Sequence, residues 1–393
     1  MTPGARVQAA IDLLEETIVA AGAGGAAADT LIARYFKTRR YAGSKDRRAV
    51  RDLVYAAIRR AGERPVSGRA AMLGLVADRP DLAALFDGTD HAPAAIAPGE
   101  LVARAGVAPA WLVAKLDTLD KAELAALLDR ATLDLRVNRL KAKRDEVLAE
   151  LPDATPTPHA PDGLRLPEGT KIETLAAYVE GRVEVQDEGS QLLAIACAAE
   201  PGMTVIDLCA GAGGKTLALA AAMANEGRLI ACDTDRRRLG NLMPRAVRAG
   251  VTIVEPLLLD PERERDALGD FVKKADLVLV DAPCSGTGTW RRNPEARWRL
   301  TRARVDKLVA LQAHVLDVAA SLVKPGGMLV YAVCSLIDEE GAGGFAAFLK
   351  RHPKWTVAPI DLPAGVVHGD GRRLTPHHDG TDGFFVARAQ APC

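Results

Sequence analysis

The first third of the chain repeats apolar residues at helical spacing. In Val7–Ala20, Asp46–Arg60 and Leu112–Leu128 an apolar side chain returns every three or four residues, which is typical of a helix with one buried face. No strand-like alternation appears before about residue 130, and Gly62–Gly106, rich in Gly, Pro and Ala, is the least regular stretch. The pattern predicts an all-α domain over residues 1–130.

A short mixed segment follows. Residues 133–140 alternate apolar with polar or charged side chains, which favours a half-buried strand, and residues 141–150 return to helical spacing. The five prolines of Pro152–Pro167 predict a loop. A short helix over Ile172–Val179 and a strand over Arg182–Val185 complete a small α+β connector, which we assign to residues 131–185.

From Met203 onward, short apolar segments alternate with longer helical patterns. This alternation is typical of parallel βαβ units and of a doubly wound sheet. A further strand, Phe384–Ala387, is expected near the C-terminus. The earlier segments that predict strands are Thr204–Asp207, Arg228–Asp233, Thr252–Leu259, Ala275–Asp281 and Gly327–Val333. We therefore expect an α/β domain over residues 186–393.

Composition excludes several classes of protein. Hydrophobic residues make up 48% and charged residues 26% of the chain, a globular balance that argues against disorder. No apolar run approaches the roughly 20 residues of a membrane helix, and the first residues lack a signal-peptide pattern. The six cysteines form no C-x-x-C pair. We expect no metal site and no disulfide framework, but reduced thiols in a cytoplasmic protein.

Basic residues cluster in two places although the net charge is zero. Arg34–Arg64 holds eleven Lys and Arg against three acidic residues, and Arg291–Lys307 holds seven against two. Such patches suit contacts with nucleic-acid phosphates, although a solvated helix face would carry the same residues. The candidate RNA-binding residues are Arg39, Arg40, Lys45, Arg47, Arg48 and Arg292.

A buried strand ends in a glycine-rich loop that opens a helix. The run is Val205-Ile-Asp-Leu-Cys-Ala-Gly-Ala-Gly-Gly-Lys-Thr216, and its glycines permit a tight turn and close approach to a ligand. Asp233 ends the next strand, near the spacing of about 20 residues at which a carboxylate binds ribose hydroxyls. Alternatively, Asp233 only caps the helix that follows it.

Three ligand classes compete for this loop. A P-loop requires glycine where Cys209 stands. A nicotinamide dinucleotide favours a small residue where Thr216 stands. S-adenosylmethionine fits best, because Asp207, just before the loop, can meet its methionyl amine.

Two cysteines and an aspartate follow the fourth and fifth predicted strands of this domain. Asp281 and Cys284 lie in Asp281-Ala-Pro-Cys-Ser-Gly-Thr-Gly288, and Cys334 ends the next strand. Ligands of open α/β sheets bind outside the carboxyl ends of the strands, so these side chains should converge beside the methyl donor. A lone cysteine is more often a small core residue, which is our interpretation of Cys197, Cys209 and Cys232.

Two thiols and a carboxylate beside a methyl donor suit methylation at carbon 5 of a pyrimidine. That carbon is a poor nucleophile until a thiolate adds to carbon 6, and a proton must leave carbon 5 before the thiol is expelled. The attacking thiol needs a lowered pKa, for instance from nearby cations. The spacing leaves open which of Cys284 and Cys334 attacks.

These motifs, in this order, resemble the RsmB/Sun family of RNA cytosine-5 methyltransferases over residues 131–393. The resemblance implies a Rossmann-like class I methyltransferase domain in which Cys334 attacks, Cys284 assists product release, and Asp281 holds the cytosine and touches the cofactor. The motifs that carry it are Gln186-Asp-Glu-Gly-Ser-Gln-Leu192, Asp207–Thr216, Asp281–Gly288 with Arg292-Asn-Pro294, Cys334-Ser335, and Asp379-Gly-Thr-Asp-Gly-Phe-Phe385.

The resemblance also assigns the cofactor site. It places Asp233 on the ribose and Asp260 near the adenine. The family loop usually has Ala-Pro where this chain has Gly211-Ala212, so a looser loop is expected. The loop residues so assigned are Cys209, Ala210, Gly211, Ala212, Gly213, Gly214 and Lys215.

The N-terminal segment Tyr35–Arg60 is similar to the NusB-like RNA-binding domain of the bacterial RsmB subgroup. The partner this implies is ribosomal RNA of the small subunit, with a target base that is single-stranded or flipped out. We thus expect a monomeric, S-adenosylmethionine-dependent RNA (cytosine-5) methyltransferase. Its rivals are a non-catalytic ribosome-assembly factor, the same reaction on tRNA, and a nicotinamide-dependent oxidoreductase. Intact Cys284, Cys334 and Asp281 argue against the first rival, and Thr216 against the last.

Overall fold

The computed structural model describes residues 1–393, and the chain forms two compact units. One contains Met1–Arg130 together with Thr289–Thr301, and the other contains Ala131–Gly288 and Arg302–Cys393. The expected connector therefore lies in the same unit as the expected α/β domain, whereas Thr289–Thr301 leaves that domain for the helical unit. No helix has the length and apolarity needed to span a membrane.

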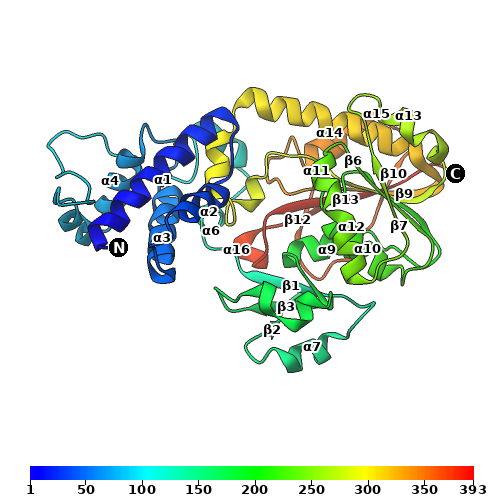
Figure 1. Cartoon of the computed structure of the whole chain (residues 1–393). Coiled ribbons are helices and arrows are strands. Elements are labelled where there is room, and N and C mark those ends of the chain that lie inside the picture. The colour runs from blue at the N-terminus through cyan, green and yellow to red at the C-terminus, as the bar shows by residue number, and fades with distance from the viewer. The chain divides into compact units, whose positions relative to one another are not determined.

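The first unit is helical, as predicted, and four longer helices form most of it (Figure 1). Their core contains Leu14, Val54, Ile58 and Met72, all fully buried. Asp46 accepts a hydrogen bond from the Gly43 N–H at 3.1 Å and so caps the start of the third helix. The four helices are α1 (Pro3–Ala23), α2 (Ala28–Thr38), α3 (Ser44–Arg60) and α4 (Gly68–Asp78).

The single helix predicted over Leu112–Leu128 is wrong. The structure has α5 (Ala110–Val113), a 3-10 turn over Ala114–Leu116 and α6 (Lys121–Ala126) instead. Asp120 caps a new helix there, since its carboxylate accepts the Glu123 N–H at 2.8 Å. The leucines recur at helical spacing because each of the short elements buries leucines of its own.

The segment Thr289–Thr301 closes two helix ends of the first unit. Arg297 is 0% exposed, and its Nη2 donates to the carbonyls of Ile58, Arg59 and Ala61 at 2.7, 2.9 and 3.0 Å. These carbonyls lie at the end of α3, where backbone acceptors lack helical partners. Glu295 accepts the N–H of Ala28, the first residue of α2, at 3.0 Å. The segment therefore places an acidic side chain at the start of α2 and a basic side chain at the end of α3.

The connector is an antiparallel sheet in the order β2-β3-β1-β4, with two short helices. Leu135, Val147, Leu164 and Val183 form its core. The loop predicted over Pro152–Pro167 is wrong in part, because it contains two short strands; proline is tolerated there since β2 is an edge strand. The elements are β1 (Leu133–Val137), α7 (Arg144–Glu150), β2 (Thr155–Pro156), β3 (Gly163–Leu166), α8 (Ala176–Val179) and β4 (Val183–Val185).

A nine-stranded sheet forms the rest of the second unit, in the order β11-β12-β13-β9-β8-β5-β6-β7, with β10 paired to β13. Strands β5 to β9 are parallel to their neighbours, and β13 is antiparallel to β9. The predicted α/β fold is confirmed, including the adjacency of the fourth and fifth strands, β8 and β9. The strands are β5 (Thr204–Asp207), β6 (Arg228–Asp233), β7 (Val254–Leu258), β8 (Ala275–Asp281), β9 (Val323–Val333), β10 (Thr356–Ala358), β11 (Val366–His368), β12 (Gly371–Leu374) and β13 (Phe384–Gln390).

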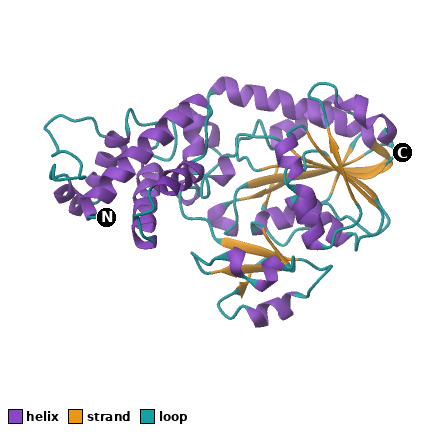
Figure 2. Ribbon diagram, viewed as in Figure 1, coloured by secondary structure: helices purple, strands orange, loops and turns teal.

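Alternate residues of these strands point to opposite faces, and helices cover both (Figure 2). Val205 and Leu279 belong to the core under α9 (Glu188–Ala196), α10 (Gly214–Ala222) and α12 (Leu242–Ala249). Their neighbours Ile206 and Val280 belong to the core under α14 (Arg302–Leu322) and α15 (Ala342–Arg351).

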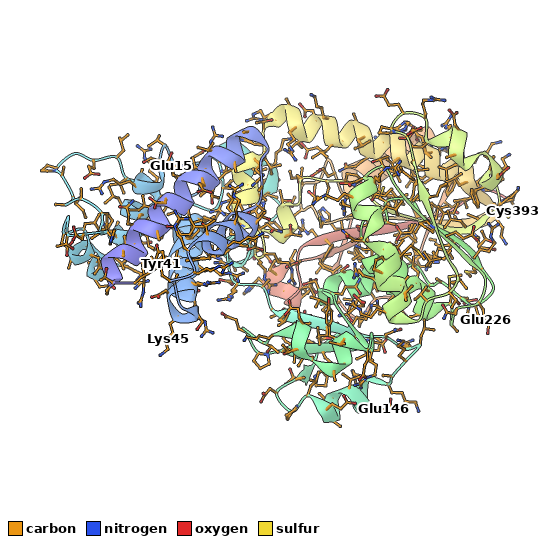
Figure 3. All side chains as sticks on the ribbon, in the orientation of Figure 1. Glu15, Tyr41, Lys45, Glu146, Glu226 and Cys393 are labelled. Carbon is orange, nitrogen blue, oxygen red and sulfur yellow. The ribbon has the colours of Figure 1, made fainter.

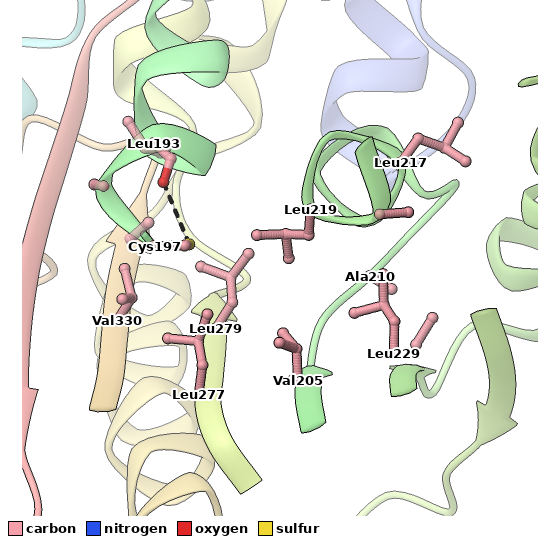
Figure 4. Packing of buried hydrophobic residues seen from close by; sticks show 14 of the residues in the cluster. Leu193, Cys197, Val205, Ala210, Leu217, Leu219, Leu229, Leu277, Leu279 and Val330 are labelled. Carbon is pink, nitrogen blue, oxygen red and sulfur yellow. Dashed lines mark hydrogen bonds between the residues drawn. The ribbon is translucent and has the colours of Figure 1, made fainter. Parts of the chain in front are cut away.

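Of the three cysteines predicted to be core residues, Cys197 and Cys232 are buried in a core, whereas Cys209 is only half-buried, in the glycine-rich loop. Cys197 lies among Leu193, Leu279 and Val330 (Figure 4), where its thiol donates to the Leu193 carbonyl at 3.4 Å. Cys232 is fully buried in the opposite core. Trp298 is buried among the helices of the first unit.

We expect Arg297→Ala to destabilise the helical unit. The change leaves the carbonyls at the end of α3 without a partner, and each buried orphan costs about 1–3 kcal/mol. Denaturant unfolding should show a loss of about 3 kcal/mol or more, with faster hydrogen exchange in α3. Arg40→Ala, at an exposed arginine, is the control and should shift stability by less than about 0.5 kcal/mol. Equal effects of the two changes would contradict this capping role.

Candidate active site

The carboxyl ends of the parallel strands carry the predicted site residues along one edge of the sheet. Following the order β9-β8-β5-β6-β7, the edge presents Cys334, Asp281, Asp207, Asp233 and Asp260. Parallel strands end at the same edge, where open α/β sheets bind ligands. Five positions far apart in the sequence are therefore in one row.

The glycine loop turns sharply between β5 and α10. Gly211 and Gly213 have φ of +56° and +87°, the left-handed conformation that side chains disfavour. The Gly211 N–H donates to Asp233 Oδ2 at 2.7 Å, which fastens the loop to the end of β6. Ala210 is held likewise, by its N–H on the Cys232 carbonyl at 2.8 Å.

Asp233 is not the cap of the next helix. Asp235 has that role, accepting the Arg238 N–H at the start of α11 (Arg236–Gly240). Asp233 accepts one N–H at each oxygen, from Gly211 and from Asp235, both at 2.7 Å. A carboxylate oxygen has two lone pairs, so each oxygen can accept one more hydrogen bond. Asp260 lies beyond β7 and is exposed.

A partly buried ion pair holds the loop from the connector side. Arg245 donates to the Ala212 carbonyl at 2.5 Å and to Glu184 at 2.8 Å. Glu184, at the middle of β4, also pairs with Arg248. The looser loop expected from Gly211-Ala212 is thus countered by a side chain that no motif had marked.

Asp207 offers an acceptor that the protein leaves unused. Its Oδ2 accepts from Thr216 Oγ1 at 2.7 Å, but its Oδ1 is buried without a hydrogen-bond partner. Burial raises the pKa of Asp207 to about 7. An unpaired buried acceptor is costly, and a cationic N–H donor of a ligand would satisfy it.

Lys215 and Asp281 form an ion pair beside the cysteines. Lys215 Nζ lies 2.7 Å from Asp281 Oδ2, and the lysine side chain is only 10% exposed. Burial lowers the pKa of Lys215, but Asp281 outweighs it, so the net pKa is raised and the amine stays charged. Cys334 contributes to that shift, which puts a fixed cation within electrostatic range of its thiol.

The two candidate cysteines touch. Cys284 Sγ and Cys334 Sγ are 3.3 Å apart, and both residues are half-buried. The hydrogen bond to Cys334, together with burial, raises the pKa of Cys284 well above its usual value. Cys284 is therefore expected to stay protonated. Burial likewise raises the pKa of Cys209, which keeps that thiol protonated in the loop.

Sequence reasoning missed Glu340. This residue is 0% exposed, and its carboxylate accepts hydrogen bonds from the residues that follow both cysteines, Ser285 and Ser335. The serine after each cysteine was the available signal. Three consecutive acids follow, Asp338 to Glu340, and only the structure shows which one is buried.

The first basic cluster lies around the start of α3. Arg40, Lys45, Arg47 and Arg48 are exposed. Figure 3 labels Lys45 and also Tyr41, a residue of the same segment that is 73% exposed. Arg39 instead packs its guanidinium 3.6 Å from the centre of the Tyr35 ring. Arg292 lies apart from this cluster in the sequence, in Thr289–Thr301, where its N–H donates to the Thr289 carbonyl.

Two family models match the chain. The model of the 16S rRNA methyltransferase RsmB/F matches residues 194–390. The model of the ferredoxin-like domain of RsmF/B-like methyltransferases matches residues 108–173, which include the start of the connector sheet.

Curated relatives and a solved structure agree with these matches. The probable ribosomal RNA small subunit methyltransferase B of Synechocystis is 36% identical over 294 residues, covering 71% of this chain and 66% of the relative. Ribosomal RNA small subunit methyltransferase B of Salmonella paratyphi C is 33% identical over 288 residues, covering 71% and 65%. The crystal structure of PH0851 superposes with a TM-score of 0.77 and 26% identity over 98% of both chains. The chain thus spans about two thirds of the length of these curated relatives.

The resemblance found in the motifs is confirmed by these matches. The RsmB/F model covers half of the chain and includes the glycine loop, Asp281 and both site cysteines. This chain belongs to the RsmB/F family of 16S rRNA methyltransferases.

Proposed function

We propose that this chain transfers a methyl group from S-adenosylmethionine to carbon 5 of a cytosine in small-subunit ribosomal RNA. The observation that carries the proposal is the contact between Cys284 and Cys334 at the sheet edge that also holds the glycine loop. The family and the relatives supply the substrate class, since their names specify small-subunit ribosomal RNA.

The residues at the edge suit this cofactor. Asp207 Oδ1, buried and unpartnered, would accept from the methionyl amine. Asp233 and Asp260 would hold the ribose and adenine, and the loop Cys209–Lys215 would follow the cofactor backbone. When bound, S-adenosylmethionine supplies an electrophilic methyl group.

The two thiols have different roles in the proposed reaction. Cys334 adds as a thiolate to carbon 6 of the cytosine, helped by the Lys215 cation, and carbon 5 becomes nucleophilic. After the methyl group has joined carbon 5, a base from solvent takes the proton of that carbon. The electron pair of that C–H bond forms the double bond between carbons 5 and 6, and the bond from carbon 6 to sulfur breaks and returns the Cys334 thiolate. Cys284, protonated and in contact, donates a hydrogen bond to the departing sulfur. Asp281, held by Lys215, would orient the cytosine.

We expect the two cysteine variants to fail in different ways. Cys334→Ala should abolish methylation and leave cofactor affinity nearly unchanged, because only the nucleophile is lost. Cys284→Ala should slow release of the sulfur and trap a covalent protein–RNA adduct, visible as a shifted band on a denaturing gel. Cys393→Ala, at the exposed chain end, is the matched control. An active Cys284→Ala together with an adduct from Cys334→Ala would reverse the two roles.

We expect cofactor affinity to depend on the protonation of Asp207. With a pKa of about 7, this carboxyl is mostly neutral at pH 6 and mostly ionised at pH 8, so it attracts the methionyl amine more strongly at the higher pH. Calorimetry should show the Kd for S-adenosylmethionine falling from pH 6 to pH 8. Asp207→Asn should remove that part of the trend, while the titration of the ligand itself remains in both proteins. Identical profiles would refute the contact.

We propose that the cluster of Arg39, Arg40, Lys45, Arg47 and Arg48, with Arg292, binds RNA phosphates. Replacing Arg40 and Arg48 by Gln should weaken RNA binding and reduce the slope of log K against log salt by about one per lost phosphate contact. The control replaces Arg79 and Arg104, exposed arginines of the same unit, with the same charge change. Equal slopes of log K against log salt in both double variants would indicate that the cluster is only a solvated helix face.

A further inference from the structure

One buried carboxylate joins the two turns that carry the cysteines. Cys284 is followed by Ser285 after β8, and Cys334 is followed by Ser335 after β9. Glu340 is fully buried between them and bonds to both serines. The turns are fifty residues apart in the sequence and have no covalent link here.

The bonds of Glu340 to the first turn fix its backbone as well as its side chain. The Ser285 N–H donates to Glu340 Oε1 at 2.8 Å, and the Ser285 hydroxyl donates to Oε2. Since Cys284 directly precedes this N–H, the direction of the cysteine side chain depends on it. Gln312 adds a second constraint by donating to Glu340 Oε1 at 3.0 Å and to the Pro283 carbonyl at 2.9 Å.

The second turn is held through its hydroxyl. Ser335 Oγ donates to Glu340 Oε2 at 2.6 Å and accepts the Ile337 N–H at 3.1 Å. The hydroxyl of Thr287 lies 3.1 Å from that of Ser335 and accepts the Leu336 N–H at 2.8 Å. Each turn is therefore tied to the other by Glu340 and again by the neighbouring hydroxyls.

Glu340 is itself anchored. The Tyr331 hydroxyl, inside β9, donates to the Glu340 backbone carbonyl at 2.5 Å. Hydrogen bonds to an ionised acceptor are roughly twice as strong as neutral ones, and an ionised carboxylate accepts at both oxygens without supplying a proton. An amide or a hydroxyl at this position could not accept from all four donors.

We propose that Glu340 is a positioning residue that sets the separation and direction of the Cys284 and Cys334 thiols. The proposal rests on the proposed function, because the two thiols must act in turn on one ring. A displacement of about 1 Å in such a pair can cost about 10²-fold in rate. Glu340 touches no reacting atom: it acts through Ser285, Ser335 and Gln312, and its charge adds to the raised pKa of Cys284.

The test measures the thiol pair directly, without RNA. Diamide removes two electrons and two protons from a pair of adjacent thiols, which become a disulfide while the azo group becomes a hydrazine. The rate of Cys284–Cys334 disulfide formation, read by mass spectrometry of peptides, reports how often the two sulfurs meet. We compare Glu340→Ala with Glu339→Ala, which removes the exposed neighbouring carboxylate.

In Glu340→Ala we expect disulfide formation to slow by about tenfold or more, and single-turnover methylation to fall by about 10²-fold. Cofactor affinity should stay within about twofold, because the glycine loop does not contact Glu340. Glu340→Gln keeps one acceptor oxygen and should restore part of both rates. Glu339→Ala should match the wild-type protein in disulfide formation, methylation rate and cofactor affinity.

Two results would overturn the proposal. Disulfide formation in folded Glu340→Ala at the unmodified rate is one, and an equal loss in Glu339→Ala is the other. If Glu340→Ala does not fold, Ser335→Ala removes the one hydrogen bond that the Glu340 carboxylate makes to the second turn, and an unchanged disulfide rate in that variant would overturn the proposal as well. A slowed disulfide rate in a protein with no methylation of ribosomal RNA at all would support the positioning role and refute the proposed function.

Discussion

Parallel pairing of β8 with β9 is the constraint on which the site depends. In this register Asp281 lies opposite Ala332, so the chain leaving β8 and the chain leaving β9 run out at the same edge. Side chains alternate between faces with a period of two, and a slip of one residue would exchange the two cores. Because Leu279 and Val330 fill one core while Val280 and Tyr331 fill the other, the cost of that slip fixes where both cysteines emerge.

Burial and neighbouring charges give the residues at that edge different protonation states. Asp207 and Cys284 are buried and lean toward their protonated forms, whereas Lys215 keeps its charge because Asp281 compensates for burial. One carboxyl with a raised pKa, one fixed cation and one protonated thiol thus lie at the same sheet edge as Cys334. These differences in pKa arise from burial and from single charged or hydrogen-bonded neighbours. They do not follow from the residue types alone.

The sequence was informative where a residue type answers a local requirement. Left-handed turns required Gly211 and Gly213, and the strands of the α/β domain followed from apolar runs that fill two cores. The sequence was not informative where contacts between residues far apart in the chain determine the structure. The break at Asp120 needed knowledge of which leucines share a core, and strand β3 was hidden among prolines. Nothing local separates Glu340 from Glu339, and nothing near Arg245 marks it as a brace for the glycine loop.

The segment Thr289–Thr301 belongs to the first unit although it lies within the sequence of the second. The chain crosses from the second unit into the first after Gly288 and returns at Arg302. A truncated protein that begins at residue 131 would keep this segment but lose the helices that enclose it. It would expose the indole of Trp298 and leave the Arg297 guanidinium without its three acceptors at the end of α3. The second unit is therefore not separated from the first by a single cut at residue 130, and gene fusions or domain swaps there would have to replace this internal segment as well.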